Sequence, residues 1–189
     1  MPESWDSPFN ILDVIGWNLA HLVKIHSIRN GISAKGQKTF TKFMNSYDEI
    51  PSYLFFALGN AIVLEVCKMT EKGGNKFNFA TLFQKLKNYS HTKFDPKKIC
   101  EAEKEYRQWM KVYYEDFKDA RNNEMAHSPV PKTPPKKFGS QLHPQKVNAA
   151  VNKLRSIYDL LAEAGVCDSL KAQPINPKIL DAFLGSLID

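Results

Sequence analysis

Apolar residues recur at steps of three and four along most of the chain, the spacing that places them on one face of an α-helix. One such stretch begins at Ser7-Pro8 and extends to about His26, and a weaker one covers Lys35 to Tyr47. A third runs from Pro51 to about Thr70 and is apolar on nearly every face. We therefore expect this third helix to be the central and most buried one.

Capping residues and proline predict the next helix starts. Asn78 precedes a short helix, and Asp95-Pro96 opens what we expect to be the longest helix, over about residues 95–128. Ser128-Pro129 must end it, because proline disfavours helical geometry in the residue before it.

The C-terminal third begins with a loop, residues 129–143, which is rich in proline and lysine and cannot continue a helix. Pro144 and Asn176-Pro177 begin further helices within residues 144–189. The first of these carries an apolar seam of Val147, Val151, Leu154, Tyr158 and Leu161. No segment alternates as a strand does, so the sequence predicts an all-α fold, a single helical domain over residues 1–189.

The charge balance is mildly basic, with 26 Lys and Arg against 20 Asp and Glu and a formal net charge of +6 at pH 7. This excess permits an anionic partner. Nearly all the cations are lysine; the arginines are Arg29, Arg107, Arg121 and Arg155. An arginine is the more informative residue, because its planar, permanently charged fork is chosen where geometry matters.

Several classes of protein are not indicated. Cys67, Cys100 and Cys167 lie far apart without histidines at ligand spacing, which indicates reduced, partly buried thiols and no zinc site. The first residues lack the features of a signal peptide, and the most apolar stretch, Tyr53 to Cys67, is too short to span a bilayer. We expect a cytoplasmic protein without a membrane helix, metal or cofactor.

The stretch RNNEMAH, from Arg121 to His127, ends the long helix. Cations in the last turn of a helix are favoured by the macrodipole, so neither residue requires a catalytic role. Positions six apart differ by about 240° around a helix and about 9 Å along it, so Arg121 and His127 do not face each other on one regular helix. A working site needs the helix to end near His127, or a second copy of the chain to supply the opposing pair across a two-fold axis. Glu124 could bridge the two, and Asn122 adds an uncharged donor and acceptor.

This Arg-Asn-x4-His pattern at the end of a long helix resembles the motif of HEPN domains, in which four to six residues separate an arginine and the polar residue after it from a histidine. Upstream, a buried helix ending VLEVCKMTEKGGNK and the short FNFATLFQKL helix look like HEPN members linked to abortive infection, whose Arg…Ala-His element is completed here by Ala126-His127. The resemblance covers roughly Pro51 to Ser128. It implies an antiparallel helical bundle of the HEPN type, here with additional terminal helices.

The resemblance also implies a function. HEPN domains commonly dimerise so that two motifs meet in a cleft, and many are metal-independent endoribonucleases. Carried onto this chain, Arg121, Asn122 and His127 would be catalytic, RNA would be the substrate, and the protein would be a toxin or antiphage effector with an antitoxin protein as a candidate partner. The residue types suit the chemistry: histidine moves protons near neutral pH, and arginine neutralises a phosphorane.

Two other interpretations remain open. HEPN relatives that have lost catalysis bind nucleotides or proteins, for example beside a nucleotidyltransferase, and a structural bundle subunit follows if the motif is coincidental. Lys132, Lys136 and Lys137 come shortly after the motif and either contact an RNA backbone or are simply solvated. The aromatic residues of the long helix could stack bases or belong to the core or a dimer seam; they are Tyr106, Trp109, Tyr113 and Tyr114.

Overall fold

The computed structural model describes residues 7–34, 41, 50–71, 76–89, 93–122, 142–170, 176, 178–179 and 181–182. Within these residues it contains five long helices: α1 (Pro8–Ala34), α3 (Ile50–Thr70), α4 (Phe79–Lys87), α5 (Pro96–Ala120) and α6 (Pro144–Glu163). The described part of the chain contains no strand, which confirms the all-α prediction.

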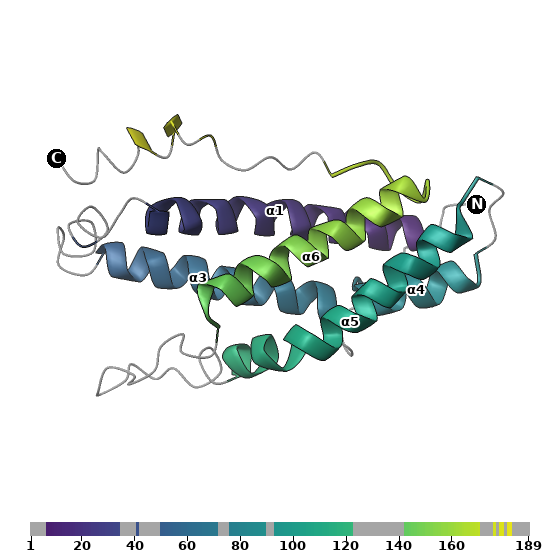
Figure 1. Ribbon diagram of the computed structural model, residues 1–189, viewed down its shortest axis with the longest axis horizontal. Helices are drawn as coiled ribbons and strands as arrows, with labels where there is room; N and C mark the ends of the chain where they lie inside the picture. Colours follow the sequence, from purple (N-terminus) through teal and green to yellow (C-terminus); the bar gives the residue numbers. More distant parts are fainter. Residues whose placement is uncertain are drawn as a thin grey trace.

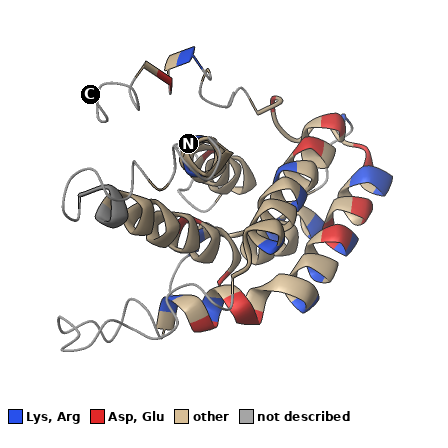
Figure 2. Ribbon diagram, turned by 60° about the vertical axis from the view of Figure 1, so that its left-hand side comes forward, with Lys and Arg blue, Asp and Glu red and all other residues tan. Residues whose placement is uncertain are grey.

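The helices pack as two antiparallel pairs, as the reversed colour order along each pair in Figure 1 shows. In the first pair α1 lies beside α3, and in the second α5 lies beside α6, while α4 contacts both members of the first pair. Three ion pairs join α5 to α6 in opposite order along the two helices: Lys98–Glu163, Glu105–Lys153 and Asp116–Lys146. Charged residues accordingly gather on α5 and α6, whereas α1 and α3 carry few (Figure 2).

One hydrophobic core joins all five helices. Trp109 of α5 is fully buried at its centre, where its indole nitrogen donates to the carbonyl of Ala150 on α6 at 2.9 Å. Tyr106 is also buried and donates to the carbonyl of Thr70 at 3.2 Å, which ties α5 to the end of α3. The predicted seam of α6 is confirmed, since Val147, Val151, Leu154, Tyr158 and Leu161 are all buried.

The predicted helix starts are confirmed where the structure describes them. The side chain of Asn78 accepts from the backbone N–H of Thr81 at 2.9 Å and so caps α4. Asp95 caps α5 in the same way, accepting from the N–H of Lys97 at 2.9 Å, and His143 caps α6. Each cap satisfies donors that have no partner inside the helix.

Two expectations about the helices were wrong. The first helix continues past His26 to Ala34 and has 27 residues, while the predicted end of the long helix at Ser128 lies outside the described residues. The reason is that no proline interrupts it and Ile32, at 1% exposure, extends its buried stripe.

The other correction concerns α3, which is not buried throughout. Phe56 and Leu64 are 41% and 42% exposed, and the buried positions lie in the second half of the helix, among them Ile62, Val66 and Met69. A helix that is apolar on every face can bury only the faces that neighbouring helices cover.

Other expectations fall partly or wholly outside the described residues. The helix predicted over residues 35–47 lies outside the described residues, except for residue 41, which is helical. For the last helix, residues 178–179 and 181–182 are helical, and Asn176 accepts from the N–H of Lys178 at 3.0 Å. No helix among the described residues is long and apolar enough to cross a membrane. Of the free cysteines, Cys67 is buried, Cys167 is intermediate, and Cys100 is exposed rather than partly buried as expected.

Candidate functional site

Arg121 and Asn122 lie directly after Ala120, the last residue of α5, where the helix widens into a π-type turn. Such turns are rare and often occur at functional positions. The other residues that the sequence assigned to the site lie outside the described residues: Glu124, His127, Lys132, Lys136 and Lys137.

The guanidinium group of Arg121 is held from two sides. Its Nε and one terminal nitrogen donate to the Oδ1 atom of Asn122 at 3.2 and 2.8 Å. Its other terminal nitrogen forms an ion pair with the carboxylate of Glu71, one residue beyond the end of α3. The hydrogen bond with Glu71 is the main reason why the pKa of Arg121 is raised above its ordinary value, so this side chain stays charged.

This arrangement leaves part of the guanidinium available. Of the five N–H donors of an arginine, three are used by Asn122 and Glu71, and no other described residue accepts from the remaining two. The side chain is 27% exposed, and that of Glu71 is 31% exposed, so the pair lies at the surface of the bundle. Glu71 and Asn122 thus orient the Arg121 side chain, which stays partly exposed among the described residues.

Glu71 is the residue that sequence reasoning missed. It makes the contact with Arg121 that we expected from Glu124, and it lies fifty positions earlier in the chain. One signal was present in the sequence, since an acid directly after a helix faces the negative end of the macrodipole. An acid in that unfavourable place indicates a cationic partner, but only the fold identifies which one.

The surroundings of the pair are aromatic and partly buried. Cys67 lies on α3 one turn before Glu71; its thiol donates to the carbonyl of Phe117 at 3.7 Å, and burial raises its pKa to about 11. On α5, Lys118 lies over the ring of Tyr114, 5.7 Å from its centroid. Burial is also the main reason that the pKa of Tyr114 is raised. The Cys67 thiol and the Tyr114 hydroxyl therefore stay neutral near pH 7 and cannot serve as bases at that pH.

The remaining candidates are resolved by burial. Tyr106 and Trp109 belong to the core and are not available to stack bases, whereas Tyr113 and Tyr114 are half-buried. His21 is exposed, and His26 is buried in a hydrogen-bonded network away from Arg121. Among the described residues, no group of three or more His, Cys, Asp or Glu side chains could hold a metal ion.

Comparison with known families gives one match. A family model described as AbiU2, of the HEPN class, matches residues 53–164, more than half of the chain. The matched region runs from α3 to α6 and includes the stretch from Arg121 to His127, while α1 precedes it. No curated protein and no solved structure matches the chain.

Proposed function

The chain belongs to the AbiU2 family of HEPN abortive-infection domains, and on this premise we propose that it is a metal-independent endoribonuclease that uses Arg121, Asn122 and His127. The observation that carries the proposal is the partly exposed guanidinium of Arg121, oriented by Glu71 and Asn122, with two N–H donors that no described residue uses. A permanently charged fork in a fixed position suits a developing phosphorane, because preorganised donors stabilise charge without reorganisation.

In the proposed reaction the 2′-hydroxyl of RNA attacks the adjacent 3′-phosphate. One histidine takes the 2′-hydroxyl proton as the O2′–P bond forms, and a second acid donates a proton to the 5′-oxygen as the P–O5′ bond breaks. The products are a 2′,3′-cyclic phosphate and a 5′-hydroxyl end. DNA lacks the attacking hydroxyl and cannot react in this way.

A homodimer is part of the proposal. Since Arg121 and His127 do not share a face of one regular helix, two chains related by a two-fold axis would place two such pairs around one cleft. One copy of His127 would then act as base and the other as acid. Light scattering at micromolar concentration should give about twice 21.6 kDa; a monomer at every concentration would remove the composite site.

The decisive experiment is RNA cleavage in excess EDTA. We expect single-stranded RNA to be cut to 2′,3′-cyclic phosphate ends and DNA of the same sequence to be spared. His127→Ala should lower turnover by about 10²–10⁴-fold, the usual contribution of general acid–base catalysis. The matched control is His21→Ala, because His21 is an exposed histidine on α1. Equal cleavage by parent and His127→Ala, or a requirement for a divalent metal, would show that the site is assigned wrongly.

A second candidate function is a non-catalytic module that binds nucleotides or a partner protein such as a nucleotidyltransferase or an antitoxin. It is favoured by the ion pair itself, since an arginine held by Glu71 and Asn122 also serves to join α3 to α5. Calorimetric titration with nucleotides separates the two candidates. Binding in the absence of any cleavage, unchanged in His127→Ala, would favour the module.

Lys132, Lys136 and Lys137 are proposed to contact the RNA backbone. Neutralising them together should weaken RNA binding and reduce its salt dependence, since each phosphate contact releases a counterion. The turnover of bound RNA should change little, which distinguishes these lysines from the catalytic residues.

A further inference from the structure

A cavity of about 190 Å³ lies between α1, α3 and the start of α6, and Arg121 is not among the described residues that line it. Its walls are mainly apolar and include Phe55, Ile62, Leu142, Pro144 and Val147. An engineered apolar cavity of about 150 Å³ is known to hold a benzene molecule, so this space suits a ligand of about one ring or a short branched chain.

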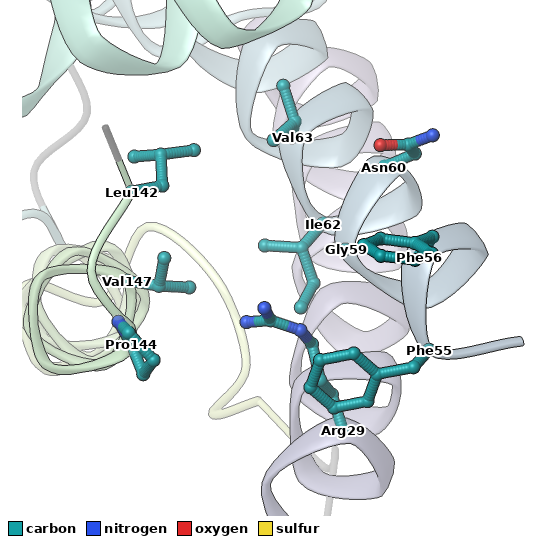
Figure 3. Close-up of a pocket in the computed structure, with 10 residues that line it drawn as sticks. All are labelled: Arg29, Phe55, Phe56, Gly59, Asn60, Ile62, Val63, Leu142, Pro144 and Val147. Carbon is teal, nitrogen blue, oxygen red and sulfur yellow. The ribbon is translucent and has the colours of Figure 1, made fainter. Parts of the chain in front are cut away.

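One cation points into this cavity. Figure 3 shows the guanidinium group of Arg29 directed from α1 toward the space between Ile62 of α3 and the Pro144–Val147 turn of α6. The ring of Phe55 covers it, with its centroid 4.8 Å from the guanidinium carbon. Arg29 therefore has an aromatic support on one side and open volume on the other.

Arg29 has no anionic partner within the described part of the chain. Its Nε is buried and has no hydrogen-bond acceptor. Burial lowers the pKa of Arg29 from its ordinary value, and no neighbouring carboxylate offsets that effect. A buried N–H without an acceptor and a cation without a counter-charge both cost free energy, which a bound anion would recover.

Three polar residues of α1 and α6 are hydrogen-bonded to one another: His26, Asn30 and Asn148. His26 and Asn30, also on α1, both contact the Oδ1 atom of Asn148 on α6, at 2.6 and 3.0 Å. The same Nε2 atom of His26 lies 3.1 Å from the amide nitrogen of Asn30, and the tautomer of the ring decides whether Nε2 donates to Asn148 or accepts from Asn30. This network joins α1 to α6 beside the cavity and supplies no acceptor to Arg29.

We propose that this cavity is a binding site for a small organic acid, with the carboxylate on Arg29 and an apolar body of about one ring between α3 and α6. The two terminal nitrogens of Arg29, which point into the cavity in Figure 3, can pair with a carboxylate through two parallel hydrogen bonds. The apolar walls select against inorganic anions, which would lose their hydration without gaining contacts. The site is separate from Arg121 and does not depend on ribonuclease activity.

Gly59 provides a means of closing the site. A Cβ atom at this position would meet only the Nε of Arg29, at 3.8 Å, which is ordinary contact. A leucine there would extend into the cavity without removing the arginine, and replacing a glycine inside a helix generally favours folding. Gly59→Leu is therefore a blocked variant that keeps the charge.

The test is thermal unfolding and calorimetry of the whole chain with phenylacetate and hexanoate, against phenylacetamide as the neutral analogue and inorganic phosphate as an anion without an apolar body. We expect the acids to raise the unfolding midpoint with concentration and the amide to bind at least about tenfold more weakly, because it lacks the charge-assisted pair. Arg29→Met and Gly59→Leu should both abolish the effect. Arg107→Met, which removes an exposed arginine from α5, should leave it unchanged.

Three outcomes would overturn the proposal. The amide or phosphate could bind as well as the acids, Gly59→Leu could bind like the parent, or the parent could bind none of the acids.

Discussion

Arg121 and Arg29 are both partly buried arginines that contact α3 or the residue after it, yet the structure treats them in opposite ways. Arg121 is paired with Glu71, and its pKa is raised; Arg29 faces a cavity whose described lining includes no carboxylate, and its pKa is lowered by burial. A guanidinium with an internal partner is oriented but keeps only part of its donors. One without such a partner is supported by an aromatic ring and is open to an external anion.

The largest expected difference between the two arginines is in catalysis. Arg121→Lys should lower RNA cleavage by about 10²–10³-fold, because a point charge does not replace a fork that meets phosphate oxygens. Arg29→Lys should cleave at the parent rate, since it lies in the separate cavity. Initial rates in EDTA measure both, with circular dichroism to confirm folding. Equal losses in the two variants would mean that neither arginine is specific to the chemistry.

Two positions on α3, one buried and one exposed, allow a matched comparison of the free energy of unfolding. Ile62→Ala should lower the free energy of unfolding by about 2–5 kcal/mol, through lost burial and a cavity. The residue two positions later, Leu64, is 42% exposed. Its truncation to alanine should lower the free energy of unfolding by only about 0.5 kcal/mol. Urea unfolding curves give both values. Similar costs at the two positions would mean that the outer face of α3 is covered in solution.

The residues around Arg29 and those around Arg121 should also differ in how a fall in pH changes their protonation. Burial lowers the pKa of His26 below 6.5, with the charge of Arg29 acting in the same direction and the hydrogen bond to Asn148 opposing them. The folded state therefore binds this proton less readily than the unfolded state. The stability contributed by a neutral His26 is complete above about pH 6.5 and is lost as pH falls through the lowered folded pKa.

The urea concentration at the unfolding midpoint should therefore decrease as the pH is lowered from 7.5 to 5.5. The decrease should be smaller in His26→Gln, because a glutamine can still hydrogen-bond to Asn148. Near Arg121, Cys67 and Tyr114 have raised pKa values and remain neutral across this range. An identical pH dependence in parent and variant would assign the acid response to other groups.

The smallest expected effect is on the Arg121 pair itself. Glu71→Gln should change the free energy of unfolding by no more than about 1 kcal/mol, since ion pairs near the surface contribute little. If Glu71 orients Arg121 for catalysis, the same variant should reduce turnover while the protein remains folded. A large loss of stability without loss of turnover would give the pair a structural role.

Local chemistry explains which parts of the fold were predictable. Asn78 and Asp95 cap their helices through hydrogen bonds to residues two or three positions away, so the sequence alone contains both partners. The seam of α6 was equally accessible, because helical periodicity determines which residues share a face. The buried stripe of α5 followed from the same periodicity, whereas the helix end predicted at Ser128 from proline placement lies outside the described residues.

What the sequence determined by itself is the set of helices, their caps, and an AbiU2-type layout with Arg121 at the end of α5. The tertiary structure decided which carboxylate meets Arg121, that the first half of α3 is partly exposed, and that Arg29 faces a cavity. These features depend on contacts between helices that are distant in sequence, such as Glu71 with Arg121. Periodicity shows which face a helix buries but not which residue it meets there, because that depends on how all the helices pack together.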